Sequence, residues 1–287
     1  MGDPVHPVAR AFSSVADVYE RARPSYPAEA VKRLAAALGL RPGATVVDLG
    51  AGTGKLTRLL VQTGAHVVAV EPLAEMRAVL ERVVPEAEAL DGTAEAIPLA
   101  AGTADAVTAA QAFHWFDPAR ALPEIHRVLR PGGRLGLIWN SRDLDDPLQA
   151  RVEELISPYR ETYPQQMSRS WRAPLTESPL FGPVEEFSVR WDQPLTRDEL
   201  AERILSISAI AALPEDERAP LLDRVRGVTA DRSEPFPFRY RTEVYVFPRS
   251  SDRPSNERGT SFQGWRTPPT SPTTWGEGER SLAAPPG

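Results

Sequence analysis

The stretch from residue 45 to residue 54 reads TVVDLGAGTG, an apolar run followed by three glycines at alternate positions. The apolar run predicts a short buried strand at residues 45–49. Gly50, Gly52 and Gly54 let the backbone turn sharply and approach a ligand closely, where a Cβ atom would collide. A strand that ends in such a loop is typical of α/β folds that bind a nucleotide.

The spacing of these glycines distinguishes between kinds of nucleotide. A dinucleotide loop has its third glycine three residues after the second, and Lys55 stands at that position. Asp48 precedes the first glycine, where a carboxylate can hold the loop and lie near a cationic group, whereas it would repel a pyrophosphate. Glu71 follows the apolar run at residues 67–70, where it can accept hydrogen bonds from two ribose hydroxyls. The alternative interpretation is that Glu71 is a solvated surface residue without a role in binding.

Apolar runs alternate with helical patterns through the first half of the chain. Strands are expected at residues 66–70, 88–90, 106–110 and 134–139, and helices at residues 55–63, 73–84 and 118–129. This repetition predicts a doubly wound α/β fold with a mostly parallel, seven-stranded, Rossmann-like sheet that is covered on both faces. Crossovers in such a sheet are right-handed, so the ligand is expected at the carboxyl ends of the strands.

The region after residue 142 is less regular. Residues 184–191 and 238–247 alternate as strands do, and we expect them to form an antiparallel pair at one edge of the sheet. Residues 147–156 and 197–211 are expected to be helices, and the helices between the two edge strands should form an inserted cap. Thr196 and Glu199 have the spacing of a capping box at the start of the second helix.

The domain boundaries follow from a change in composition near residue 249. We expect one domain at residues 1–249, with a cofactor-binding core at about 30–142 and a cap with C-terminal strands at about 143–249. Residues 250–287 are rich in Ser, Thr, Pro, Gly and Arg and predict a disordered tail. The alternative is a partner-binding segment that uses Trp265 and Trp275.

The overall composition indicates a globular protein whose partner is a small molecule. Hydrophobic residues make up 41% of the 287 residues, and the net charge of −6 gives no general attraction to nucleic acids or anionic lipids. We therefore expect no nucleic acid, no membrane, a cytoplasmic location, and a monomer or a homodimer. The chain has no cysteine, and His6, His66 and His126 do not have the spacing of metal ligands, so no metal is expected.

Four segments together resemble successive motifs of the class I S-adenosylmethionine-dependent methyltransferases (methyltransferase type 11), in that family's order and spacing. They are residues 46–54, 71–76, 92–98 and 128–133. The resemblance implies S-adenosyl-L-methionine as the cofactor. The implied binding residues are Asp48, Gly50, Ala51, Gly52 and Gly54 near the methionine part, Glu71 at the ribose, Pro72, Leu73, Thr93, Ala94 and Glu95 around the adenine, and Gln111 at the methionine end. Many relatives have Asp at the position of Thr93, whose hydroxyl can still accept a hydrogen bond from the adenine amino group.

Two further segments resemble the subgroup that includes trans-aconitate methyltransferases. Residues 113–117 read FHWFD and follow the expected fourth strand, and residues 19–27 read YERARPSYP, like the entrance segment of that subgroup. The substrate-binding residues that follow are Tyr19, Arg23, Tyr26, His114, Trp115 and Trp139.

The residues near the reacting end each have two interpretations. His114 is the candidate catalytic base for a hydroxyl or amine acceptor, or it holds a loop by hydrogen bonding. Arg23 binds a substrate carboxylate in a bidentate fork, or it ties the N-terminal helix to the body through a salt bridge. Trp115, Phe116 and Trp139 line an apolar acceptor pocket, or they belong to the core.

The function expected from these observations is methyl transfer to a small molecule, at an oxygen, with a carboxylic acid as the first acceptor to consider. A carboxylate needs no base, whereas a hydroxyl or amine of a secondary metabolite, the alternative acceptor, would gain from one. A nicotinamide-dependent oxidoreductase is a candidate from another class, which the glycine spacing disfavours. A non-catalytic protein that binds the cofactor as a structural ligand is a third.

Overall fold

The computed structural model describes residue 20, residues 23–159 and residues 171–251. The predicted substrate residue Tyr19 lies outside the described residues, and so does the expected tail except for Ser250 and Ser251. The interpretations of these two segments stay predictions.

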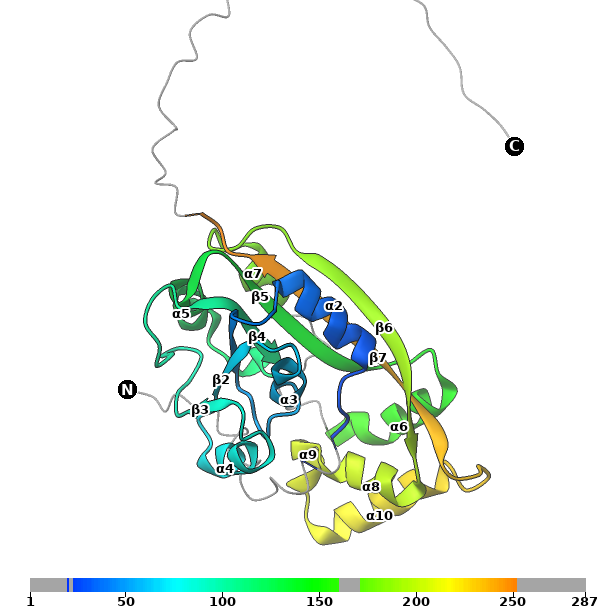
Figure 1. Cartoon of the computed structure of the whole chain (residues 1–287). Coiled ribbons are helices and arrows are strands. Elements are labelled where there is room, and N and C mark those ends of the chain that lie inside the picture. Colours follow the sequence, from blue (N-terminus) through cyan, green and yellow to red (C-terminus); the bar gives the residue numbers. More distant parts are fainter. Residues whose placement is uncertain (1–19, 21–22, 160–170, 252–287) are drawn as a thin grey trace, which may run out of the picture. The chain divides into compact units, whose positions relative to one another are not determined.

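Seven strands form one sheet in the order β3-β2-β1-β4-β5-β7-β6 (Figure 1). The strands are β1 Thr45–Leu49, β2 His66–Val70, β3 Glu88–Leu90, β4 Ala104–Ala110, β5 Leu129–Arg142, β6 Glu185–Leu195 and β7 Phe236–Pro248. The first five strands pair in parallel, and β7 runs antiparallel to both β5 and β6. The predicted fold class is confirmed, and so is the antiparallel pair at one edge.

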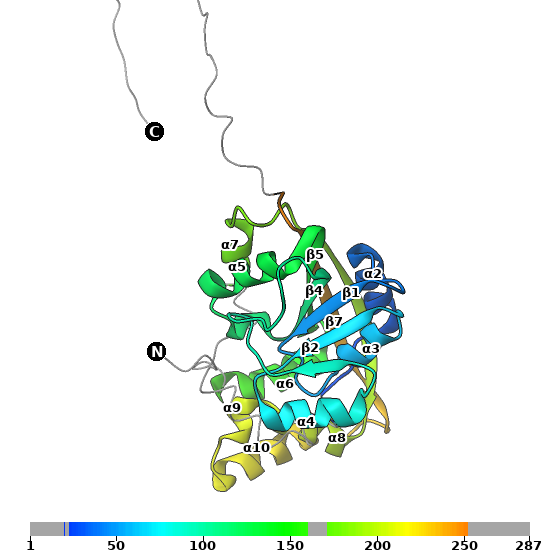
Figure 2. The same ribbon diagram turned by 60° about the vertical axis from the view of Figure 1, so that its left-hand side comes forward.

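Helices cover both faces of the sheet, as Figure 2 shows with α2 and α3 on one side and α5 and α7 on the other. The helices are α2 Ala28–Leu38, α3 Thr57–Val61, α4 Ala74–Val83, α5 Pro118–Val128, α6 Pro147–Ile156, α7 Arg172–Thr176, α8 Arg197–Leu205, α9 Ser208–Ala211 and α10 Glu215–Gly227, with the 3-10 turns η2 Phe113–Trp115 and η3 Ser157–Tyr159. None of the described helices is long and apolar enough to cross a membrane.

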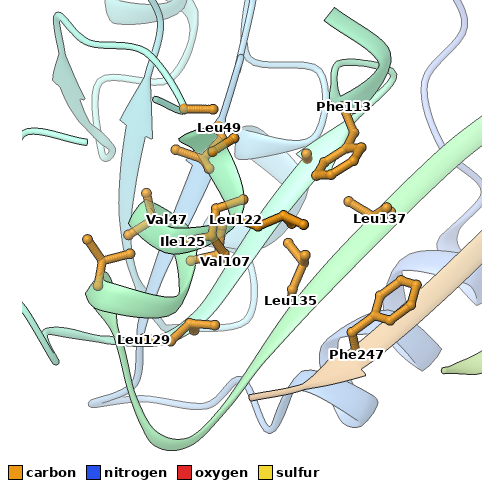
Figure 3. Close-up of a cluster of buried hydrophobic side chains, with 14 of the residues drawn as sticks. Val47, Leu49, Val107, Phe113, Leu122, Ile125, Leu129, Leu135, Leu137 and Phe247 are labelled. Atoms are coloured by element: carbon orange, nitrogen blue, oxygen red, sulfur yellow. The ribbon is translucent and has the colours of Figure 1, made fainter. Parts of the chain in front are cut away.

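The alternation of side chains along β1 divides the core between the two faces. Val46 belongs to the cluster that also holds Leu34 of α2. Leu49 belongs to the opposite cluster, with Leu122 of α5 and Phe247 of β7 (Figure 3). Because neighbouring residues of a strand point to opposite faces, a strand buried on both sides reads as a continuous apolar run. The apolar run at residues 45–49 is therefore typical of an interior strand of the sheet, as β1 is.

A separate apolar cluster holds the cap together. It joins residues of α6, α8 and α10 to Phe236, Phe238 and Tyr240 at the start of β7. Tyr240 is the partner of Arg142, the last residue of β5, in the antiparallel ladder. The cap therefore lies beyond the carboxyl end of β5, on the edge of the sheet where the ligand is expected.

The expected helix at residues 197–211 is two helices, α8 and α9, so this prediction was wrong in its length. The capping box is confirmed, because Thr196 Oγ1 accepts from the N–H of Glu199 and the Glu199 carboxylate accepts from the N–H of Thr196. The break follows at Ser206, whose Oγ donates to the main-chain oxygen of Arg203 at 2.7 Å. A serine hydroxyl that bonds to the backbone competes with the helical hydrogen bonds and favours a helix end.

The helix α10 was not expected from the sequence. Its segment is rich in charged residues and contains Pro220, so its apolar periodicity is weak. Only Leu221 and Val225 of this helix are buried, and both face the cap cluster. Tertiary packing, which a local pattern does not record, stabilises this helix.

Candidate active site

The glycine loop follows β1 and turns through left-handed backbone conformations. The φ angles of Gly50, Gly52 and Gly54 are 62°, 58° and 85°, values that side chains other than glycine rarely adopt. A Cβ atom on Gly50 would lie 2.8 Å from the Cβ of Ala112, so the loop and the segment after β4 need a glycine there. A Cβ atom on Gly52 would meet nothing within 4 Å. The loop is therefore packed tightly at Gly50 and open at Gly52.

Glu71, at the end of β2, joins the loop to the start of α4. Its Oε2 accepts from the N–H of Gly52 at 2.8 Å, and its Oε1 accepts from the N–H of Leu73 at 3.0 Å. Burial raises the pKa of Glu71, while these two amides and the charge of Arg77 act in the opposite direction. Each carboxylate oxygen has a further lone pair, so Glu71 can hold the loop and still accept a ligand hydroxyl. Its neighbour Pro72 stands between Glu71 and the first residue before α4, Leu73.

Asp48 lies beneath the loop and is 1% exposed. One carboxylate oxygen accepts from Thr57 Oγ1 on α3 and the other from Thr108 Oγ1 on β4, each at 2.8 Å. Burial raises the pKa of Asp48 to about 6, although the two threonine hydroxyls lower it. These contacts tie β1, α3 and β4 together, which matches the expected role of holding the loop.

The residues expected around the adenine differ in what they contact. Thr93 Oγ1 is buried and has no hydrogen-bond partner in the described part of the chain. Ala94 is 3% exposed and belongs to the apolar core. Glu95 Oε1 accepts from the N–H of Asp117 at 2.8 Å, next to the start of α5. A buried hydroxyl without a partner is unfavourable, so Thr93 marks a place where the polar edge of a ligand would fit.

A pocket opens beside the glycine loop at the carboxyl ends of β1 and β4. It is lined by the loop, by the N-terminal segment, by the ends of β4 and β5 and by α8 of the cap. The pocket brings together six of the residues predicted from the sequence: Arg23, Tyr26, Gly50, Ala51, Gly52 and Gln111. Segments far apart in the sequence therefore meet where the parallel sheet predicts a ligand.

Gln111 and Asn140 connect the strand ends on the floor of this pocket. Gln111 has a φ of 56°, an uncommon value for a residue with a side chain, and its Nε2 donates to the main-chain oxygen of Asn140 at 3.1 Å. Asn140 Nδ2 donates to the main-chain oxygen of Ser25 at 3.0 Å, and its Oδ1 accepts from Thr242 at 2.6 Å. Strain of this kind is concentrated at functional sites, where the surrounding contacts maintain it.

The aromatic residues expected at the reacting end form a group of their own. The ring of His114 in η2 lies 4.6 Å from the ring of Trp115 and 5.4 Å from that of Trp139, measured between centroids. Trp139 is 1% exposed and also packs against Trp171. None of His114, Trp115 and Trp139 lines the pocket beside the glycine loop. Trp139 belongs to the apolar core and also lines a second pocket together with Trp171 and Tyr245, so the roles predicted for His114, Trp115 and Trp139 all remain predictions.

Several pocket residues were not predicted as site residues by the sequence analysis, among them Lys55, Asn140 and Arg203. Lys55 Nζ lies 3.3 Å from Glu20 Oε1, and burial lowers the pKa of Lys55 while Glu20 raises it. Asn140 directly follows Trp139, where the apolar run of β5 ends. Arg203 stands beside Ile204 on the buried side of α8, and a charged residue at a core position was the signal that could have found it.

Comparisons with known proteins identify relatives over most of the chain. A family model described as a methyltransferase domain matches residues 47–137. An uncharacterised methyltransferase of Mycobacterium tuberculosis is 46% identical over 223 residues, which is 76% of this chain and 85% of that protein. A trans-aconitate 2-methyltransferase of an Azoarcus species is 38% identical over 133 residues, which is 45% of this chain and 52% of that protein.

The fold also has neighbours among solved structures. A protein from Anaeromyxobacter dehalogenans, described as a type II methyltransferase, superimposes with a TM-score of 0.62 at 22% identity, over 79% of this chain and 97% of that chain. At this identity the likeness concerns the fold alone.

Proposed function

The chain belongs to the class I S-adenosylmethionine-dependent methyltransferases, and from this premise we propose that it binds S-adenosylmethionine at the loop of residues 50–54 and methylates a small carboxylic acid. The observation that carries the proposal is the pocket in which the loop, Arg23, Gln111 and the cap residue Arg203 meet. A cofactor held by the loop would present its reactive end to an acceptor in this pocket.

The loop and its surroundings fit the cofactor in three respects. Gly52 leaves open space where any other residue would place a side chain. Glu71 stands at the end of β2 with lone pairs left for two hydroxyls, as a ribose requires. Thr93 offers a buried hydroxyl that lacks a partner in the described residues, which suits the polar edge of an adenine.

The charge of the pocket supports an anionic acceptor. Three cationic side chains line it, those of Arg23, Lys55 and Arg203. When bound, the cofactor supplies an electrophilic methyl group on a sulfonium. A carboxylate acceptor would take this methyl group on an oxygen without losing a proton, and S-adenosylhomocysteine would be the leaving group. The protein has then to orient the acceptor and exclude water.

A carboxylic acid as acceptor is also supported by the Azoarcus relative, whose name specifies trans-aconitate, a carboxylic acid. That likeness spans about half of each chain, so it contributes less than the pocket does. His114 has no necessary part in this reaction, because a carboxylate is already deprotonated at neutral pH.

A methyl-transfer screen tests the proposal. The protein is incubated with S-adenosylmethionine and a panel of small carboxylic acids, alcohols, phenols and amines, and the release of S-adenosylhomocysteine is measured. Release above the acceptor-free rate with acids, and with acids best, is the expected result. Turnover of amines or phenols with none for any acid would contradict the acceptor class, and no binding of S-adenosylmethionine would contradict the proposal as a whole.

A further inference from the structure

Strand β6 is a long strand at one edge of the sheet (Figure 1). It pairs with β7 over 11 residues in a register without a bulge, and no other described segment hydrogen-bonds to its backbone. Natural edges are usually protected by a short strand, a bulge or a proline, and the proline of β6, Pro194, stands next to its last residue. The rest of this edge can therefore accept a further strand.

Three apolar side chains of β6 are only half-buried. Phe187, Val189 and Trp191 alternate along the strand and so share one face. Phe187 packs against Arg33 of α2, whose Cζ lies 3.9 Å from the ring centroid, and Trp191 stacks on Tyr240. A strand added at the outer edge would cover more of these side chains, and burial of apolar surface stabilises an association.

The opposite face of β6 carries opposite charges on the two sides of Ser188. Glu186 precedes it by two positions and Arg190 follows it by two. Glu186 lies 2.9 Å from Arg172 Nη1, and Arg190 pairs with two aspartates of the chain at 2.7 Å each. The side chains of Glu186 and Arg190 are still 51% and 56% exposed, so each can take another partner. This pattern is complementary to itself when it is reversed about Ser188.

We propose that the outer edge of β6 pairs with β6 of a second copy of the chain, antiparallel and centred on Ser188. A twofold axis perpendicular to the sheet would join the two seven-stranded sheets into one. Ser188 then faces Ser188 of the other copy, and Phe187 faces Val189. Glu186 of each copy faces Arg190 of the other. The inference is independent of the function proposed above.

The charges favour this register over the neighbouring ones. If the pairing were centred on Glu186 or on Arg190, identical charges would lie opposite each other. If it were centred on Val189, Glu186 would face Asp192. If it were centred on Phe187, no two charged residues of β6 would face each other. Opposite charges stabilise an antiparallel pair and like charges destabilise it, so the proposed register is the favoured one.

Cysteine substitution tests the register, because the chain has no cysteine of its own. Residues directly opposite in an antiparallel pair have Cβ atoms about 4.5–5.5 Å apart, close enough for a disulfide after a small adjustment. Full-length Ser188→Cys is expected to form a covalent dimer under mild oxidation, measured on a non-reducing gel. Asp192→Cys is the matched control on the same face, since its two copies would be about 26 Å apart. Absence of the Ser188→Cys dimer, or equal cross-linking of Asp192→Cys, would overturn the proposal.

Charge reversal tests the same contacts without a cross-link. In sedimentation equilibrium the wild type should reach twice the mass of one chain, which is 31.4 kDa. Glu186→Arg and Arg190→Glu each place like charges opposite each other, so each should weaken self-association by about tenfold or more. An equimolar mixture of the two variants should recover the dimer, because opposite charges then meet at both pairs. Glu81→Arg of α4 and Arg120→Glu of α5 change exposed residues by the same charge and should leave the association unchanged.

Three results of the sedimentation experiment would contradict the proposal. They are a wild type that stays monomeric at its highest soluble concentration, a mixture that associates no better than its two components, and an equal loss of association in the control variants. Within one strand, residues 186 and 190 are about 13 Å apart, so recovery in the mixture cannot come from a contact inside one chain.

Ser188→Glu replaces Arg190→Glu if the loss of the aspartate pairs prevents folding. Ser188 is exposed, and a glutamate at this position would face its own copy across the twofold axis. Self-association should then weaken by about tenfold or more, whereas Ser188→Thr should leave it within about twofold of wild type. Unchanged association in Ser188→Glu would overturn the assignment.

Discussion

Replacing single glycines by alanine separates the role of the loop in folding from its role in binding. The three variants are Gly50→Ala, Gly52→Ala and Gly102→Ala. All three glycines have similar φ angles, 62°, 58° and 67°, so each alanine pays a similar cost for the left-handed conformation. That cost is about 1–2 kcal/mol. Gly102 does not line the pocket, which makes it the control.

The three variants should differ in unfolding free energy according to what the added Cβ atom meets. At Gly52 and Gly102 the Cβ would meet nothing within 4 Å, so these variants should lose about 1–2 kcal/mol of unfolding free energy. At Gly50 the Cβ would lie 2.8 Å from the Cβ of Ala112, well inside normal carbon contact. Overpacking of this kind adds about 1–3 kcal/mol, so Gly50→Ala should lose about 2–5 kcal/mol in total.

Urea denaturation and calorimetric titration of S-adenosylhomocysteine measure the two effects. Gly102→Ala should bind the ligand like wild type, and Gly52→Ala, at equal stability, should bind it about tenfold more weakly because the new methyl group occupies the open space of the site. If Gly52→Ala and Gly102→Ala bound equally well, the open space at Gly52 would not be the cofactor site. If Gly50→Ala were no less stable than the other two, the close packing against Ala112 would be wrong.

Three other variants test separate parts of the account. Burial raises the pKa of Asp48 to about 6, so the folded state holds its proton more tightly than the unfolded chain, and stability falls as the pH rises from about 4 to 6. In Asp48→Asn this pH dependence, up to about 3 kcal/mol, should be absent. Urea unfolding of the variant and of wild type at each pH measures it. A difference in unfolding free energy that does not change with pH would contradict the prediction. Glu71→Gln should weaken S-adenosylhomocysteine binding by about tenfold, because an amide cannot accept from both Gly52 and Leu73; unchanged calorimetric affinity would count against the ribose site. His114→Gln should keep turnover of an acid within about threefold, since a carboxylate needs no base, and a loss of about a hundredfold in the initial rate would show a base instead.

The fold could be predicted because its signals are local. Buried runs such as residues 66–70 have the same bounds in the sequence prediction and in the structure. The cap was harder, because α10 carries only two buried side chains and the break after α8 depends on one serine hydroxyl. Local periodicity records neither tertiary packing nor a single side-chain hydrogen bond.

The site likewise contains residues that could be predicted from the sequence and residues that could not. The loop and Glu71 lie at strand ends, where the sequence order itself fixes their position, so they were predicted and they meet in the structure. Arg203 was missed because its partner Tyr240 is 37 positions away and its place in the pocket exists only after the cap has folded onto the sheet. Asn140 likewise gains its role through Thr242, which the sequence does not place beside it.

A crystal structure of the complex with S-adenosylhomocysteine tests the central claim most directly. The account predicts the ribose hydroxyls within hydrogen-bond distance of the Glu71 carboxylate, the adenine edge at Thr93, and the sulfur end over Gly52 facing Gln111. Ligand density elsewhere on the sheet, or a ribose that does not contact Glu71, would contradict it.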